Sequence, residues 1–302
     1  MPHSDELLTR SAITELTTQY ATEATRFLVC NGVDRAEVAM LAEEQAPCPV
    51  NHYFGPGIYI REVSMGAGLF AIGHKQTKEH VNIMLKGRVL MLNEDGSTSE
   101  LVAPLMFTGK PGRKMGYILE DVVWQNIYAT EERDVQVLEN MFLDKSPAWQ
   151  ELENRRLEAQ TKKHVDDRDD FQRMLNEAGF TAHTVQRQSE NPDDQCSMPQ
   201  GSWKVKTGQS PIQGTGVFLT ADAAAGEVLG PARVKGLRTP LGRYTNHSPT
   251  PNARMVLLPT DDIYLVTIGD VKGCAGGHDG DEVTIDYRQA LRLHGITLGE
   301  PT

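Results

Sequence analysis

The chain has 302 residues and a formal charge of -11, from 30 basic and 41 acidic residues. This length suffices for one large domain or two ordinary ones with a core each, and two is the expectation. The acidic balance argues against a nucleic-acid partner held through its phosphates and favours neutral or basic partners.

The four cysteines are widely spaced and include no C-x-x-C pair, so they do not suggest a zinc site or a redox dithiol. A reducing, cytoplasmic setting is the simplest interpretation. No apolar run approaches the roughly 18 residues that span a bilayer. The start "MPHSDELLTR" lacks the basic-then-apolar order of a secretory signal. We therefore expect no membrane contact.

The first segment, about residues 4–45, has the pattern of a helix. Ser4 is placed to cap it, and apolar residues recur at helical spacing from Leu7 onward. Gly32 interrupts the pattern, which "DRAEVAMLAEEQ" then resumes. The sequence predicts a helical N-terminal segment over residues 1–45.

Residues 46–143 form short β-rich runs separated by turn signals such as "EDGS" and "KPGRK". In one run, Val81, Ile83 and Leu85 alternate with Asn82 and Met84, as in a half-buried antiparallel strand. Many short strands at regular spacing predict a sandwich or a barrel. The runs are "GIYIREVSM", "LFAIG", "HVNIMLKGRVLMLN", "VVWQNIYAT" and "VQVLENMF".

Residues 144–195 predict two or three charged helices. "SPAWQELENRRLEAQTKKH" has a cap and a proline at the first helical position, and "DDFQRMLNEAGF" ends in Gly179. These helices either mediate assembly or form a solvated spacer. The polar tract "QRQSENPDDQ" resembles a linker, after which a second β-rich region begins, within a domain expected over residues 196–302.

Three motifs of the last third occur in order: "IQGTGVF" (212–218), "RYTNHSPTPN" (243–252) and "GDEVTIDY" (280–287). The two prolines of the second motif predict a pre-shaped loop, because the residue before a proline avoids the α region. Each motif alone is weak. Together, over roughly 202–288, they resemble the SET-domain family of protein-lysine methyltransferases, in which the second and third segments cross in a knot-like manner.

This resemblance implies a pocket for S-adenosylmethionine and a SET-like β fold. Tyr287 would be the catalytic tyrosine, while Asn246 and His247 would hold the amino-acid and adenine portions of the cofactor. Tyr244 and Tyr264 are either part of a lysine channel or ordinary core tyrosines. The implied cofactor-binding set is Gly214, Gly216, Tyr244, Asn246 and His247.

Two departures from the family pattern affect this hypothesis. Only 30 positions separate Gly216 from Asn246, whereas family members usually insert a substrate-binding subdomain there. No cysteine cluster follows Tyr287, so the zinc-bound segment that closes the pocket in many relatives is absent. The domain is therefore either a minimal methyltransferase or a SET-like fold kept for structure or docking.

The segment "GLFAIGHKQTKEHVNIMLKG" (68–87) resembles the first motif of cupins, with Gly68, His74 and Gly87 in register. The resemblance implies a cupin-like β-barrel over residues 46–143. Gln76 replaces the second histidine of that motif and His80 replaces its glutamate, and a fourth ligand has no clear counterpart. Metal binding at His74 and His80 is therefore disfavoured against polar roles in a barrel mouth. The stretch "GYILEDVVW" also resembles cupin-like proteins of tailed bacteriophages.

The fold class expected from these features is mainly β with helical segments: a cupin-like barrel, a helical linker and a SET-like domain. The first functional hypothesis is S-adenosylmethionine-dependent methylation of a lysine on a protein substrate, with the barrel serving oligomerisation or recognition. The second is a non-catalytic assembly protein, such as a bacteriophage virion component. A metal-dependent cupin enzyme ranks last. Cupin-like barrels often pair through their sheets, so the cupin resemblance implies a homo-oligomer. The expected location is the cytoplasm, or the virion if the chain is phage-encoded.

Overall fold

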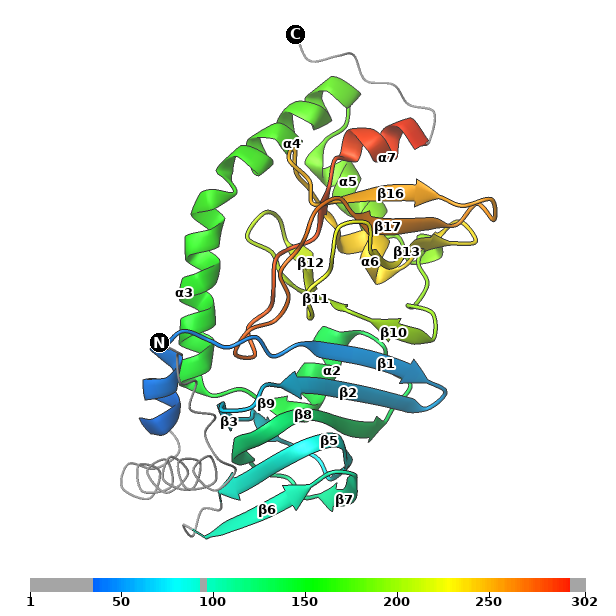
Figure 1. The fold of residues 1–302 in the computed structure, drawn as a ribbon. Coiled ribbons are helices and arrows are strands. Elements are labelled where there is room, and N and C mark those ends of the chain that lie inside the picture. The colour runs from blue at the N-terminus through cyan, green and yellow to red at the C-terminus, as the bar shows by residue number, and fades with distance from the viewer. Residues whose placement is uncertain (1–34, 93–96, 294–302) are drawn as a thin grey trace, which may run out of the picture.

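A computed structural model describes residues 35–92 and 97–293, and Figure 1 shows their arrangement. Residues 35–41 are helical. The greater part of the helix predicted over residues 1–45 lies outside the described residues. The first half of the chain builds one large sheet, and the last third builds smaller sheets above it in Figure 1.

The large sheet has eight strands in the order β10-β1-β2-β8-β5-β6, with β3 on β8 and β7 on β5. Within the described residues β6 and β10 end the strand order without pairing to each other, so the barrel predicted from the sequence is not closed. The strands are β1 (Val50–Gly55), β2 (Ile58–Met65), β3 (Phe70–Ile72), β5 (His80–Leu92), β6 (Thr98–Val102), β7 (Leu105–Gly109), β8 (Met115–Ala129) and β10 (Gly201–Trp203). Two short strands, β4 (Lys75–Gln76) and β9 (Leu143–Asp144), pair beside it.

The predicted strand at 80–92 is β5, and its buried face is the more polar one. Asn82 and Met84 are fully buried, whereas Val81 and Leu85 are exposed. Burial of Asn82 is tolerated because its carbonyl oxygen accepts from the Trp124 indole at 3.0 Å and from the Asn126 amide at 2.8 Å. Part of the apolar surface of β5 therefore faces outward.

The run "VQVLENMF" is a helix, α2 (Val135–Phe142), and not the strand that its composition suggested. Asp134 caps this helix by accepting from the main-chain N–H groups of residues 136 and 137. Val135, Leu138 and Phe142 are buried at helical spacing on one side. The capping side chain and this spacing outweigh the strand propensity of the valines.

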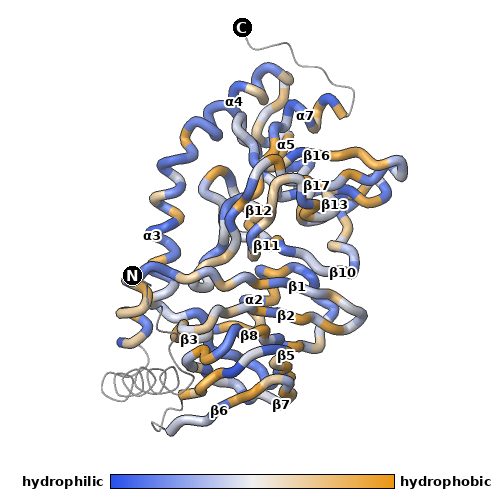
Figure 2. The backbone as a smooth tube through the Cα atoms, viewed as in Figure 1, coloured by the Kyte–Doolittle hydropathy of each residue, from blue (hydrophilic) through white to orange (hydrophobic). Residues whose placement is uncertain are grey.

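Three helices, α3 (Pro147–Lys163), α4 (Val165–Ala178) and α5 (Ala182–Ser189), follow, and a short 3-10 turn, η1 (Pro192–Asp194), ends this region. Ser146 caps α3 by accepting from the Trp149 N–H at 3.1 Å, and Gly179 ends α4 with a left-handed conformation. Figure 2 shows α3 and α4 as largely hydrophilic. No helix within the described ranges is both long and apolar enough to span a bilayer.

The last third combines small sheets around its own core. β11 (Val205–Gln209) and β12 (Thr215–Leu219) form a hairpin, and a four-stranded sheet has the order β14-β13-β17-β16. A parallel pair joins β15 (Asn246–His247) to β18 (Thr284–Ile285). The remaining elements are β13 (Val228–Val234), β14 (Leu237–Arg238), β16 (Ala253–Leu257), β17 (Ile263–Thr267), α6 (Pro240–Tyr244) and α7 (Tyr287–Leu293). Leu219, Leu265 and Val283 are fully buried in this core.

Charged side chains join the two halves of the molecule. The Lys206 ammonium on β11 lies 2.8 Å from the Glu139 carboxylate on α2 and 2.7 Å from the Asp279 carboxylate. A second connection is β10, which comes after the linker in sequence but pairs with β1 of the large sheet. The two halves therefore share both a strand pairing and a buried ion cluster.

Candidate functional site

The second and third motifs lie side by side, as the sequence predicts. Asn246 opposes Thr284 and His247 opposes Ile285 in the parallel β15-β18 pair. Beyond the pair, the Asn252 amide donates to the Glu282 carbonyl at 2.8 Å and its oxygen accepts from the Thr284 N–H. In Figure 1 these segments cross next to β12, which carries the first motif.

The Asn246 side chain connects the second motif to the other two. Its amide nitrogen lies 2.8 Å from the Glu282 carboxylate and 2.9 Å from the Ser210 hydroxyl. It also lies 3.0 Å from the carbonyl of Gln213 and 3.3 Å from that of Thr215. These two carbonyls bracket Gly214, which has a φ of 55°. The amide therefore holds the glycine loop against the third motif.

Glu282 is a buried carboxylate that forms no close ion pair with a described residue, although the charge of His164 acts on it from a distance. It is 8% exposed, and its hydrogen bonds come from Ser210 and Asn246. Burial raises the pKa of Glu282, although the bonds from Asn246 and Ser210 oppose that shift. Gly216 lies against this carboxylate so closely that an added Cβ would overlap it. A positively charged ligand group would offset the cost of burying this anion.

The His247 ring is held on both nitrogens. Nδ1 accepts from the Tyr287 N–H at 3.1 Å, so the ring proton is on Nε2 and is donated to Asp170 at 2.8 Å. The same Asp170 accepts from Arg288 at 2.7 Å, and that guanidinium keeps the pKa of Asp170 well below its usual range. The imidazole therefore contributes to the arrangement of α4, β15 and α7.

The Tyr287 hydroxyl points back to the second motif. It donates to the carbonyl oxygen of Thr245 at 2.8 Å, and its ring lies 5.3 Å from the ring of His247. Phe171 of α4 packs edge-on against Tyr287 at 5.8 Å. Burial raises the pKa of Tyr287, so the phenol is neutral at physiological pH. A neutral phenol beside a carbonyl oxygen presents two hydrogen-bond acceptors to an amine.

The other two predicted tyrosines, Tyr244 and Tyr264, have their main contacts elsewhere. Tyr244 ends α6, packs on the core of the last third and carries the Arg243 guanidinium over its ring at 4.7 Å. Tyr264 lies on β17 opposite Pro231 and Val256. The sequence analysis missed Ser210, Glu282 and Asp170. Glu282 lies within the quoted third motif, whereas nothing in the sequence relates Asp170 to a residue 77 positions away.

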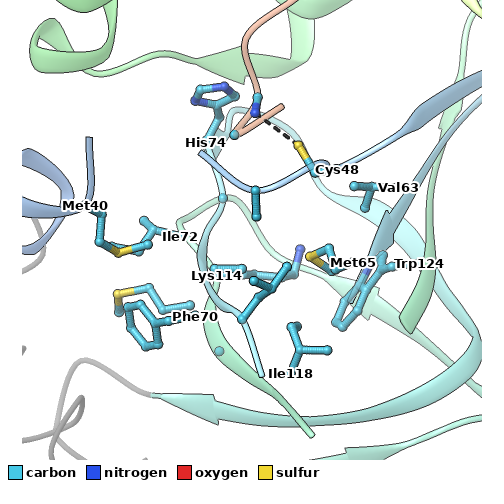
Figure 3. A pocket seen from close by; sticks show the side chains of 18 of the residues that line it. Met40, Cys48, Val63, Met65, Phe70, Ile72, His74, Lys114, Ile118 and Trp124 are labelled. Atoms are coloured by element: carbon cyan, nitrogen blue, oxygen red, sulfur yellow. Dashed lines mark hydrogen bonds between the residues drawn. The ribbon is translucent and has the colours of Figure 1, made fainter. Parts of the chain in front are cut away.

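A cavity of about 270 Å³ lies in the other half of the molecule, between the large sheet and the start of the described chain (Figure 3). Its wall is mainly apolar, with Met65, Phe70 and Trp124 among its lining residues. Two cationic side chains, Arg61 and Lys114, also line it, and burial lowers the pKa of Lys114 to about 8. Cys48 lines the same cavity and accepts from the Gly277 N–H at 3.1 Å.

The two histidines considered as metal ligands have separate partners. His74 lines the cavity, lies edge-on to Trp149 at 5.1 Å, and has its pKa lowered to about 3 by burial. His80 contacts the Lys78 carbonyl and lies 3.1 Å from the Lys114 ammonium. Across the described part of the chain, no three His, Cys, Asp or Glu side chains gather as a metal site requires.

Comparison with known proteins gives matches to solved structures alone. No protein-family model matches the chain, and no curated protein matches its sequence. A cupin-domain protein from Bordetella pertussis is 16% identical with a TM-score of 0.25, over 29% of this chain and 98% of that one. A cupin-2 domain protein from Shewanella frigidimarina is 12% identical with a TM-score of 0.24, over 32% and 92%.

A third match is an RmlC-like cupin with a double-stranded β-helix fold from Methanocaldococcus jannaschii. It is 14% identical with a TM-score of 0.24, over 29% of this chain and 84% of that chain. The similar structures thus include cupin-like β folds, and each covers about a third of the present chain. At these scores the likeness carries no argument about a ligand or an activity.

Proposed function

We propose that the site formed by Asn246, Glu282 and Tyr287 transfers a methyl group from S-adenosylmethionine to the side-chain amine of a protein lysine. The carboxylate of Glu282 beside Gly216, which is buried and has no close ion pair with a described residue, is the observation that carries this proposal. The cofactor bears both an ammonium and a sulfonium cation, and either would compensate this anion. The negative charge of Glu282 is therefore complementary to the positive charges of the cofactor. The resemblance of the three sequence motifs to the SET-domain family also supports the proposal.

S-adenosylmethionine supplies an electrophilic methyl group when bound, and the remaining tasks are positional. The main chain at Gly214 allows close approach, since no described atom lies near the position that a side chain would take there. The Tyr287 oxygen and the Thr245 carbonyl accept from the lysine amine and orient its lone pair. Because the phenol stays protonated, its O–H continues to donate to the Thr245 carbonyl, and the lone pairs of the phenol oxygen remain free to accept.

The test measures cofactor affinity and turnover separately. Isothermal calorimetry with S-adenosylmethionine should give binding to the wild type and at least about tenfold weaker binding to Glu282→Gln, since a charge-assisted contact is lost. Tyr287→Phe should retain cofactor affinity and lower the methyl-lysine formed in a protein extract, measured by mass spectrometry, by about 100-fold. Tyr117→Phe, a half-buried tyrosine of β8, is the matched control. Absence of binding at millimolar cofactor contradicts the proposal.

A second candidate function is non-catalytic assembly of copies of this chain, the class to which a virion component would belong. The outward apolar side chains of the large sheet favour it: Leu85 is 50% exposed and Met106 is 69% exposed. Ile83 pairs with Met106 across β5 and β7, which places these side chains on one face with Val81. Light scattering should show an oligomer that Leu85→Glu with Met106→Glu converts to monomers, while Val228→Glu, at the exposed first position of β13, does not.

A further inference from the structure

Two cysteines from opposite ends of the sequence face each other where the two halves of the molecule meet. Cys48 precedes β1, and Cys274 lies in the loop between β17 and β18. Their sulfur atoms are 3.9 Å apart, and the Cys48 N–H donates to the Cys274 carbonyl at 3.2 Å. The neighbouring residues Pro47 and Ala275 form an antiparallel bridge, so the cysteines are cross-strand neighbours.

We propose that Cys48 and Cys274 form a reversible disulfide when a small peroxide reaches Cys48 through the cavity. Opposed residues with a main-chain hydrogen bond have Cα atoms about 5.5 Å apart. A disulfide accepts Cα separations of about 4.4–6.8 Å. The sulfur atoms must approach from 3.9 Å to about 2 Å, which side-chain rotation supplies. This inference is independent of the methyl-transfer proposal.

The surroundings distinguish the two sulfur atoms. Cys48 lines the cavity and is half-buried, whereas Cys274 is 6% exposed. Cys48 accepts from the Gly277 N–H and shares a hydrogen bond with the Cys274 thiol, and these contacts, the thiol contact first, lower the pKa of Cys48 to about 6. The same contact raises the pKa of Cys274. Cys48 is therefore the thiolate that attacks, and Cys274 is the thiol that resolves.

The chemistry balances with hydrogen peroxide as the oxidant. The Cys48 thiolate attacks one peroxide oxygen, the O–O bond breaks, and the hydroxide that leaves is protonated to water. Cys48 is then a sulfenic acid. The Cys274 sulfur loses its proton and attacks the Cys48 sulfur, and the S–O bond breaks with release of a second water. Two thiols and one peroxide thus give one disulfide and two waters.

The remaining described cysteine offers a matched control. Cys196 is half-buried as well, but its thiol contacts the Leu237 carbonyl and no second sulfur. Burial raises the pKa of Cys196, so its thiolate fraction is small. A Cys196→Ser variant should therefore leave the oxidation reaction unchanged.

The experiment treats the full chain with hydrogen peroxide and maps its peptides without reduction by mass spectrometry. The wild type and Cys196→Ser should yield a linked peptide containing residues 48 and 274, which dithiothreitol removes. Cys274→Ser should stop at a Cys48 sulfenic acid that a dimedone reagent captures, and Cys48→Ser should give neither product. The oxidised wild type should melt on the order of 10 °C higher than the reduced protein.

The wild-type protein alone can refute the proposal, so the test does not depend on whether the variants fold. A wild-type digest in which peroxide produces no link between residues 48 and 274 overturns the inference. A link that forms between molecules, or that joins Cys196 instead, overturns it as well. Equal dimedone capture at Cys48 and Cys196 would show that the hydrogen bonds to Cys48 confer no selectivity.

Discussion

The ion cluster between the two halves gives a quantitative prediction for Lys206→Met. The Lys206 side chain is 8% exposed and lies within 2.8 Å of two carboxylates, on Glu139 and Asp279. Burial opposes its charged form, yet these carboxylates raise the pKa of Lys206. Methionine keeps the length and most of the packing of lysine but removes the ammonium. The substitution therefore isolates the charge.

The expected loss is about 3 kcal/mol in the free energy of unfolding. Removing one member of a buried pair costs roughly 3–5 kcal/mol, because the partner is left charged and unpaired. The lower end applies here since Lys145 remains 2.9 Å from Glu139. At about 2–4 °C per kcal/mol, the melting temperature should fall by about 6–12 °C.

The matched control is Lys204→Met, two residues earlier in the chain. Lys204 pairs with Glu227 at 2.7 Å, with the two side chains 37% and 32% exposed. An exposed pair contributes roughly 0–1 kcal/mol, so the melting temperature should fall by less than about 4 °C. Calorimetric scans of both variants at one protein concentration measure the difference. Equal losses would refute the claim that burial distinguishes these pairs.

Three further predictions concern the core, the sheet and acid stability. Leu265→Ala, at a fully buried position, should lower the free energy of unfolding by about 2–5 kcal/mol in urea titrations. Gly87→Ala should cost at least about 2 kcal/mol in the same titrations, because Gly87 has a φ of 93° and an added Cβ would overlap the Asp121 main chain. The Arg288 pairing holds the pKa of Asp170 below its unfolded value of about 3.9. Ionised Asp170 therefore stabilises the folded protein above about pH 3.9, and this contribution is lost as the pH falls toward the lower folded-state pKa. Asp170→Asn should flatten the acid limb of a stability-pH curve; an unchanged slope contradicts the assignment.

The neighbouring motifs were predictable because their residues carry strong local information. Pro249 and Pro251 restrict the loop that follows Asn246. The loop and the third motif then meet in a parallel pair, with the Tyr287 N–H bound to His247. The predicted adjacency therefore concerned the second and third motifs, which this pairing joins. The roles assigned to their residues remain predictions.

The strand partners and the faces of the sheet were not predictable from periodicity. β5 has the expected alternation, but its buried face carries Asn82, whose cost is offset by Trp124 and Asn126 on the neighbouring strand. Alternation identifies two faces without saying which one meets a polar partner. The segment Val135–Phe142 is a helix although its valines favour a strand, because the Asp134 cap and the burial of one helical face outweigh that preference.

The contacts across the middle of the molecule come from residues far apart in the sequence. Cys48 and Cys274 are separated by 226 positions, and His247 and Asp170 by 77. Neither pair follows a spacing rule, since both depend on how separately folded segments meet. Such pairs become visible only when the three-dimensional arrangement is known.

The helical segment expected as a linker or spacer contacts both candidate sites. At one end, Trp149 of α3 lies edge-on to His74 of the cavity and stacks on His278 at 5.0 Å. At the other end, Asp170 of α4 bonds to His247, and Phe171 of α4 packs against Tyr287. A solvated spacer would bury no side chain at either site, yet Trp149 is 7% and Asp170 7% exposed. The two helices therefore hold the halves in a defined relation through packed side chains.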